Sequence, residues 1–171
     1  AQDFVRGFYP QTDKEGLIVD ERWNGGGYIQ PWFVDTLARK AKAGIQVRNA
    51  ADSQDAVSID GPKVMLINGY AGSGGDFFPW MFRQQGLGPL VGKRTWGGLV
   101  GIGAGAPLVD GGGVTAPGFA IYDYASGGII AENTGVNPDV DVDARPDLVA
   151  KGRDPQLERA IEIVLEQVRK R

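Results

Sequence analysis

A serine flanked by glycines is the first feature of this sequence that could carry chemistry. Ser73 lies in the stretch Asn68-Gly-Tyr-Ala-Gly-Ser-Gly-Gly-Asp76, which follows the apolar residues 64–67. A serine between a strand and a helix presents its hydroxyl where free amides and the helix dipole favour a developing negative charge. The pattern indicates a nucleophile, although the Gly-x-Ser-x-Gly spacing of α/β hydrolases is not met. The alternative is a glycine-rich turn whose serine only caps the next helix.

A second glycine-rich stretch, Arg22-Trp-Asn-Gly-Gly-Gly-Tyr28, follows the apolar residues 17–19. If both apolar runs are parallel strands, their turns lie at the same carboxyl edge of the sheet, where ligands of open α/β sheets bind. Backbone N–H groups from the two turns could then form an oxyanion hole, which needs two fixed donors about 3 Å from the nascent alkoxide. Alternatively, Asn24 and its glycines form only a sharp turn.

Acidic residues near the end of the chain are the third candidate feature. Glu132 ends an apolar run and could orient a catalytic base, although an isolated glutamate is more often a solvated charge. Asp139, Asp141 and Asp143 have the spacing of the polar face of an edge strand and raise the question of a cation site. No spacing typical of a calcium-binding loop is present, so we expect no metal.

The elements that must position these residues alternate along the first half of the chain. Strands are expected at 17–19 and 63–68, and helices over about 31–43 and 76–85, with a polar loop at 49–61. This order predicts parallel pairing with right-handed crossovers. Short strands at 107–109, 114–115, 119–122 and 128–131, separated by glycine or serine turns, predict antiparallel hairpins.

A final helix is expected from Asp154 as N-cap and Pro155 in the first turn. Its predicted apolar face consists of Leu157, Ala160, Ile161, Val164, Leu165 and Val168. The fold class is therefore α/β, in a single domain over residues 1–171.

Composition excludes several classes of function. The 171 residues carry a formal net charge of −3 with both signs interspersed, so neither nucleic acid nor an anionic membrane is an expected partner. The chain has no cysteine, which excludes disulfides and thiolate zinc sites. It also has no histidine, which excludes a Ser-His mechanism carried by this chain alone.

Taken together, five stretches resemble the C-terminal catalytic core of tricorn-type serine proteases, in peptidase family S41. The resemblance covers nearly the whole chain in the family's order. The stretches are 22–27, 68–76, Gly-Lys-Arg-Thr-Trp-Gly-Gly-Leu-Val-Gly at 92–101, Glu-Asn-Thr-Gly-Val-Asn-Pro-Asp at 132–139, and Gly-Arg-Asp-Pro-Gln-Leu at 152–157.

The resemblance implies a ClpP/crotonase-like β/α superhelix, with a mixed sheet, flanking helices and β-hairpins in the second half. It implies cleavage of peptides or unfolded polypeptides through an acyl-enzyme, without a cofactor. Ser73 matches the nucleophile, and the amides of Gly27 and Gly74 match the oxyanion hole. Glu132 matches the carboxylate that helps to orient the histidine through a serine-histidine pair.

In that family the serine-histidine pair lies in an upstream helical segment, which a PDZ domain separates from this core and a β-propeller precedes. We therefore expect these parts of a parent chain, and further copies of it, as partners, in the cytoplasm or, if a leader was lost, the periplasm. Without the histidine the chain should be inactive alone, since loss of a triad member costs roughly 10⁴ to 10⁶ in kcat. A Ser/Lys dyad, as in other branches, could replace it, and Lys93 is the nearest downstream lysine, but its place beside Arg94 favours a surface charge.

Two alternatives and two departures accompany this hypothesis. The chain could be a non-catalytic binding or assembly module, or a crotonase-like acyl-CoA enzyme, although the latter would not need the Ser73 turn. Position 74 is glycine where tricorn has aspartate, which keeps the backbone amide. The loop 44–53 offers no clear match to the acidic residue that selects basic P1 side chains, so a basic preference is in doubt.

The isolated chain should expose apolar surface where the absent domains would dock, and this predicts that it self-associates.

Overall fold

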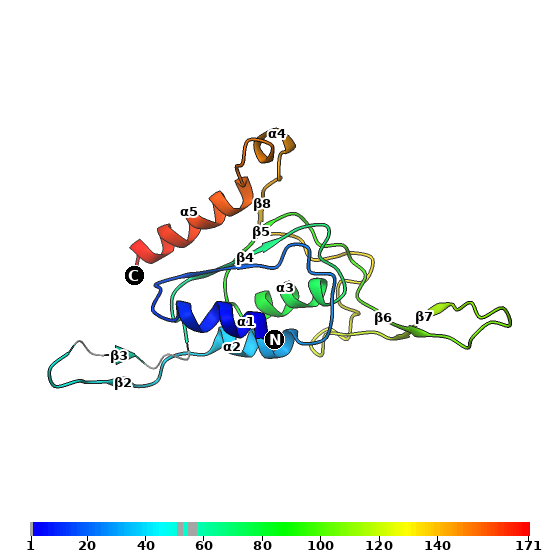
Figure 1. Ribbon diagram of the computed structural model, residues 1–171, viewed down its shortest axis with the longest axis horizontal. Coiled ribbons are helices and arrows are strands. Elements are labelled where there is room, and N and C mark those ends of the chain that lie inside the picture. Colours follow the sequence, from blue (N-terminus) through cyan, green and yellow to red (C-terminus); the bar gives the residue numbers. More distant parts are fainter. Residues whose placement is uncertain (1, 51–52, 55–57) are drawn as a thin grey trace.

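A four-stranded parallel sheet organises the chain, as shown by the computed structural model in Figure 1, which describes residues 2–50, 53–54 and 58–171. The strands are β1 (Leu17–Asp20), β4 (Lys63–Ile67), β5 (Leu90–Gly92) and β8 (Val140–Asp141), in the order β1-β4-β5-β8. Each neighbouring pair is parallel. The expected α/β class is therefore confirmed.

Strand β4 is buried on both faces, as expected of a central strand in a parallel sheet. Because side chains alternate along a strand, Met65 and Ile67 belong to one hydrophobic cluster, and Val64 and Leu66 belong to the other. The turns that follow β1, β4 and β5 lie at the same edge of the sheet, which is the edge where the candidate chemistry was expected.

Helices cover both faces of the sheet (Figure 1). Helices α1 (Gln2–Phe8), α2 (Gln30–Ala38) and α3 (Gly74–Gln84) pack over one face, and α5 (Pro155–Arg169) packs over the other. A short 3₁₀ helix, η1 (Tyr9–Gln11), follows α1, and α4 (Pro146–Val149) precedes α5. None of the helices in the described part of the chain is both long and apolar enough to cross a membrane.

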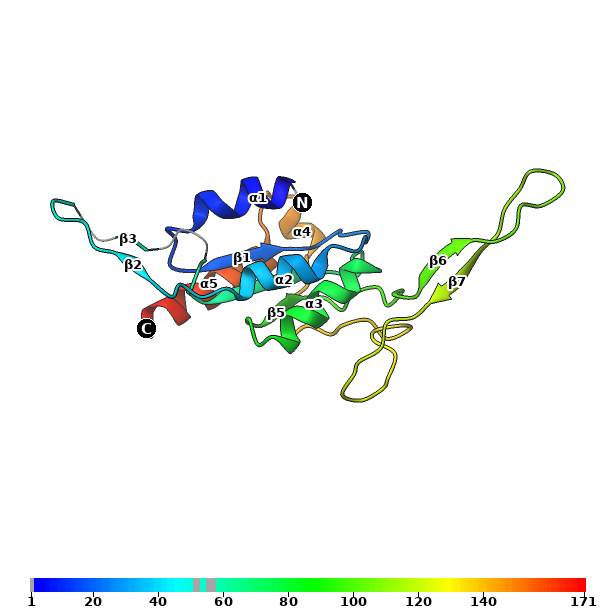
Figure 2. The ribbon, with the colours of Figure 1, turned by 90° about the horizontal axis from the view of Figure 1, so that it is seen from below.

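Two antiparallel ribbons project from opposite ends of the molecule (Figure 2). One pairs β2 (Gly44–Ile45) with β3 (Ser53–Gln54), and the other pairs β6 (Gly101–Ala104) with β7 (Thr115–Phe119). Hairpin structure in the second half is thus confirmed, and the antiparallel pairs lie in ribbons separate from the parallel sheet.

Three expected boundaries differ from the structure. Residues 107–109 form a turn, because Leu108 exchanges backbone hydrogen bonds with Gly111 and Gly112. The strands expected at 119–122 and 128–131 reduce to the end of β7 and one bridge between Tyr122 and Ile129. The loop expected at 49–61 contains β3, and its residues 51–52 and 55–57 lie outside the described part.

Helix α2 ends at Ala38, earlier than the predicted position 43, because the chain after it finds other partners. The Ala41 amide donates to the Asp60 carboxylate at 3.0 Å instead of to a helical carbonyl. Helix α3 begins two residues before its predicted start.

Helix α5 begins as predicted, with the Leu157 amide donating to Asp154 at 3.0 Å and proline in the first turn. Its predicted apolar face was wrong in part, since Ile161 is 42% exposed and Leu165 is 48% exposed. The buried stripe includes Ala160, Ile163 and Val164. Sequence periodicity defined a broad apolar face but not the part of it that contacts the sheet.

Candidate active site

Ser73 stands between β4 and α3, at the N-cap position of the helix, with φ 55° and ψ −115°. A non-glycine residue in such a conformation costs on the order of 1–3 kcal/mol and persists only where its surroundings hold it. The Ser73 amide donates to both the Gly98 carbonyl and the Asp76 carboxylate, each at 2.9 Å. Ser73 therefore occupies the helix N-cap, which is the position that both interpretations of the turn require, as a helix cap and as a nucleophile.

Positive φ angles at non-glycine residues concentrate around the predicted site. In the described chain they occur at Trp23, Ser73, Ala131 and Asn133. Trp23 precedes residues 24–27, which we call the first glycine turn, and Ala131 and Asn133 flank Glu132. Such conformations cluster at functional sites, so their distribution supports the three segments that the sequence singled out.

The two glycine turns pack directly against each other. A Cβ atom on Gly26 would lie 3.0 Å from Ser73 Oγ and 3.3 Å from the Gly74 nitrogen. The Gly27 carbonyl accepts a hydrogen bond from Gln30 Nε2 at 3.0 Å, and a side chain on Gly74 would collide with both groups. Glycine at these positions allows the close approach.

Asp76 ties the serine turn to the next loop of the sheet edge. Its side chain is fully buried and accepts four hydrogen bonds. Thr95 Oγ1 (2.5 Å) and the Gly97 amide (2.8 Å) donate to Oδ1, and the amides of Ser73 (2.9 Å) and Gly98 (3.0 Å) donate to Oδ2. Because a buried carboxylate needs such partners, the four bonds fix both turns in place.

Glu132 lies at the same site, where one of its oxygens already has partners. Its Oε2 accepts hydrogen bonds from the amides of Leu99 (2.6 Å) and Val100 (2.8 Å). The carboxylate therefore holds the backbone that forms one wall of the site. Its expected role in orienting a histidine remains a prediction.

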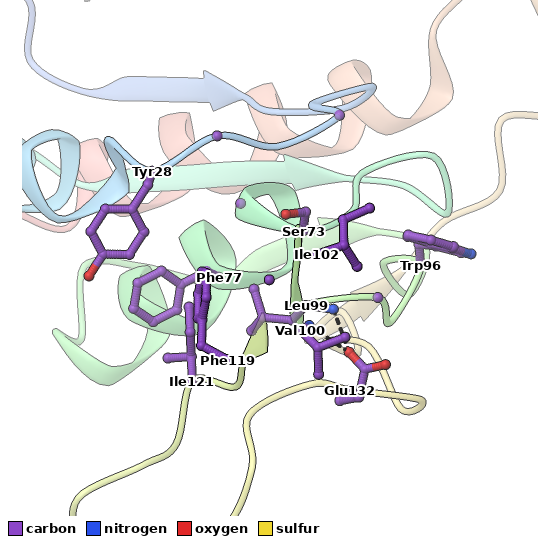
Figure 3. Close-up of a pocket in the computed structure, with 15 residues that line it drawn as sticks. Tyr28, Ser73, Phe77, Trp96, Leu99, Val100, Ile102, Phe119, Ile121 and Glu132 are labelled. Carbon is purple, nitrogen blue, oxygen red and sulfur yellow. Dashed lines mark hydrogen bonds between the residues drawn. The ribbon is translucent and has the colours of Figure 1, made fainter. Parts of the chain in front are cut away.

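A cavity of about 530 Å³ opens beside Ser73, within the range of small-ligand pockets (Figure 3). Ser73, Gly27, Gly74 and Glu132 all line it, so the structure brings the predicted site residues together. The other side chains around it are mainly apolar: Tyr28, Phe77, Trp96, Leu99, Val100, Ile102, Phe119 and Ile121.

Arg22 anchors the first glycine turn to the C-terminal helix. Its guanidinium donates to Asp20 at 2.7 Å and to Asp154 at 2.8 Å. The hydrogen bond from Arg22 lowers the pKa of the Asp154 carboxyl below its usual range. The ion pairs explain why the resemblance extended to residues 152–157, far from Ser73 in the sequence.

Two expectations about charged residues are confirmed, the surface position of Lys93 and the polar face of the edge strand. Lys93 donates to Asp141 at 2.5 Å, and this hydrogen bond raises its pKa, so the lysine is a protonated surface cation and does not serve as the base. Asp139, Asp141 and Asp143 are exposed along the edge strand β8 and its flanks, and Asp139 accepts from Arg83 (2.8 Å) and from the Leu90 amide (2.7 Å) at the start of β5. Within the described residues no three acidic side chains gather as metal ligands would.

Sequence reasoning missed two residues that shape the site. Asp76 follows Ser73 by three positions, and this Ser-x-x-Asp spacing at a helix start was a signal that could have identified it. Gln30 is buried and holds the Gly27 carbonyl, and no local pattern indicates this. The apolar wall was also missed, since Tyr28, Phe119 and Ile121 come together only in the fold.

Comparison with known proteins gives a consistent picture. Residues 2–142 match the model of Peptidase family S41. The tricorn protease of Thermoplasma volcanium is 39% identical over 169 residues, which cover 98% of this chain and 16% of that protein. Tricorn protease homolog 1 of Streptomyces coelicolor is 42% identical over 158 residues, which cover 91% of this chain and 14% of that protein.

A crystal structure of the tricorn protease superposes on the chain with a TM-score of 0.88 at 39% identity, covering 98% of this chain and 16% of that one. The chain spans between 14% and 19% of the length of the curated relatives that it matches.

Proposed function

Because the chain belongs to peptidase family S41, we propose that it carries the nucleophile of a serine peptidase that cleaves peptide bonds through an acyl-enzyme on Ser73. The observation that supports this most directly is the strained Ser73 turn, which packs against the first glycine turn at the rim of a cavity. The substrates would be peptides or unfolded polypeptides.

In the proposed reaction, Ser73 Oγ attacks the carbonyl carbon of the scissile bond while a base removes its proton. The carbonyl oxygen becomes an oxyanion, which the amides of Gly27 and Gly74 would stabilise. The intermediate then collapses, the C–N bond breaks, and the base returns the proton to the leaving amine. Water attacks the resulting ester and regenerates the Ser73 hydroxyl.

The base must come from outside these residues, because the chain contains no histidine and Lys93 is paired with Asp141. We propose that other segments of a longer parent chain supply it, as the family resemblance implies, and that the assembled protein is a cytoplasmic homo-oligomer. Tyr28, Tyr122 and Tyr124 are more than half exposed beside the cavity, which is consistent with partner surfaces close to the site.

The cavity also indicates which side chain of the substrate would bind beside Ser73. Its wall is apolar, and the carboxylate of Glu132 is held by the amides of Leu99 and Val100. An apolar P1 side chain would bury surface there, at roughly 25 cal/mol per Å². We therefore propose an apolar preference at P1.

A fluorophosphonate probe, applied to the full-length gene product, tests the proposed function. We expect covalent labelling of Ser73 and cleavage of a fluorogenic peptide, with both abolished in Ser73→Ala. Ser126→Ala is the matched control, because Ser126 lies in an exposed turn away from the cavity and should change neither signal.

Absence of labelling and of cleavage in the folded, assembled protein would show that the chain is a non-catalytic module that keeps the peptidase fold.

A further inference from the structure

Glu21 is a buried acidic residue that the proposed reaction does not use. It directly follows β1, its side chain contacts Asn24 of the first glycine turn, and only 4% of the residue is exposed. Its Oε2 accepts a hydrogen bond from Asn24 Nδ2 at 3.1 Å, and its Oε1 has no partner among the described residues. A buried carboxylate with a bare oxygen is costly, and the cost falls when the group carries a proton.

Asn24 connects Glu21 to both glycine turns. Its side-chain oxygen accepts from the Gly26 amide at 3.0 Å, and its backbone carbonyl accepts from the Gly72 amide at 3.0 Å. Gly26 in turn packs against the Ser73 side chain. A displacement of Asn24 would therefore change the position of the oxyanion turn relative to the nucleophile.

The charges around Glu21 favour its neutral form. The pKa of the Glu21 carboxyl is raised to about 9, mainly by burial; the negative charges of Asp76 on α3 and Asp20 on β1 contribute to the rise, and the hydrogen bond from Asn24 opposes it. Arg22 gives little compensation, because its guanidinium binds Asp20 and Asp154.

We propose that Glu21 is a positioning residue: its uncharged carboxyl holds Asn24, and through Asn24 the turn that contains Gly26 and Gly27, against the Ser73 turn. This inference rests on the proposed function, because it assigns to Glu21 the geometry of the oxyanion hole. Loss of the proton leaves a buried negative charge near Asp76 with one oxygen unpaired, so the turn that carries Asn24 must shift to let water solvate it, and this lowers the reactivity of Ser73.

The first test is the pH profile of Ser73 labelling by a fluorophosphonate in the full-length gene product. One pH unit above its pKa, a carboxyl is about one tenth protonated, so the labelling rate of the wild type should fall about tenfold between pH 8 and 10. Glu21→Gln keeps the shape and hydrogen bond without a titrating proton, so its rate should fall less than about twofold in the same range. Glu15→Gln, at an exposed glutamate, is the matched control and should follow the wild type.

Infrared difference spectra give a readout that does not need catalysis. A protonated carboxyl band should be present at pH 7, fall to about half near pH 9 and be almost absent at pH 10, and it should be missing from Glu21→Gln. An equal alkaline fall in Glu21→Gln and in the wild type would overturn the proposal, as would the absence of this band.

If Ser73 is unlabelled in every variant, the proposed function fails, and the fluorescence of Trp23 decides the role of Glu21. Trp23 lies between Glu21 and Asn24 and stacks on Tyr70 with ring centroids 4.1 Å apart. The contribution of Trp23 to the emission is the difference between spectra recorded with and without Trp23→Phe. This contribution should change between pH 8 and 10 in the wild type and stay constant with Glu21→Gln. An identical change in both would show that Glu21 does not hold the turn.

Discussion

Thr95 Oγ1 donates a hydrogen bond of 2.5 Å to Asp76 Oδ1, and the same hydroxyl oxygen accepts the Val136 amide at 2.8 Å. The Asp76 carboxylate thereby connects the serine turn with the loop after β5 and, through Thr95, with the segment after Glu132. The serine turn and the loop after β5, which both line the cavity, therefore depend on one buried carboxylate.

Replacement of Asp76 by asparagine should destabilise the fold strongly. The amide would turn an NH₂ group toward two of the four donors that now point at the carboxylate, and unpaired buried groups cost about 1–3 kcal/mol each. We expect the free energy of unfolding, measured with urea, to fall by about 3 kcal/mol or more.

Asp139→Asn is the control for this loss, because Asp139 also accepts a backbone amide but lies partly exposed. Its cost should be near 1 kcal/mol. A cost for Asp76→Asn no larger than that of the control would contradict the central role of Asp76.

Substitutions of Glu132 should separate the effect of its negative charge from the effect of its hydrogen bonds. Glu132→Gln retains an acceptor for the amides of Leu99 and Val100, so its unfolding free energy should stay within about 1 kcal/mol of the wild type. The rate of Ser73 labelling in the assembled protein should nevertheless fall by about tenfold or more if the negative charge assists the base.

Glu132→Ala leaves both amides unpaired and should cost a further 1–3 kcal/mol or so of stability. If Glu132→Gln labels Ser73 at the wild-type rate, the carboxylate only supports the wall of the cavity.

Local patterns in the sequence predicted much of this arrangement. The apolar run at 63–67 and the glycine stretches after it identified a buried strand, a strained turn and the sheet edge, because each depends on neighbouring residues. The apolar face of α5 was misjudged at Ile161 and Leu165, since tertiary packing selects the part of a helix face that is buried. The hydrogen bonds of Gln30 and Glu21 could not be predicted, because they depend on how the turns fold back.

The apolar wall of the cavity should control which peptide bonds are cleaved. Ile121→Glu places a carboxylate beside the P1 side chain in the cavity. The ratio of kcat/KM for a lysine substrate to that for a phenylalanine substrate should then rise by about tenfold or more, which corresponds to about 1.4 kcal/mol. Ile129→Glu, at an exposed position outside the cavity, is the matched control and should leave the ratio unchanged. An unaltered ratio in Ile121→Glu would place the P1 pocket elsewhere.

The buried carboxyl of Glu21 should make stability depend on pH in a direction opposite to that of an ion-paired acid. Its pKa is about 9 in the folded chain against an ordinary value of 4.5, so between these values the folded state binds more protons than the unfolded state. The free energy of unfolding contributed by this group is therefore greatest below pH 4.5 and falls as the pH rises toward 9, by at most about 1.4 kcal/mol per pH unit.

Urea unfolding of the wild type and of Glu21→Gln at several values between pH 5 and 8 measures this difference. That window avoids most of the titration of Lys63, whose pKa burial lowers to about 8 and whose contribution to stability rises with pH between 8 and 10.5. The wild type should lose stability relative to Glu21→Gln at each step upward in pH, while Glu15→Gln follows the wild type. Parallel curves for the wild type and Glu21→Gln would mean that Glu21 is already ionised in the folded protein. The proposal that this buried carboxyl carries a proton would then be wrong.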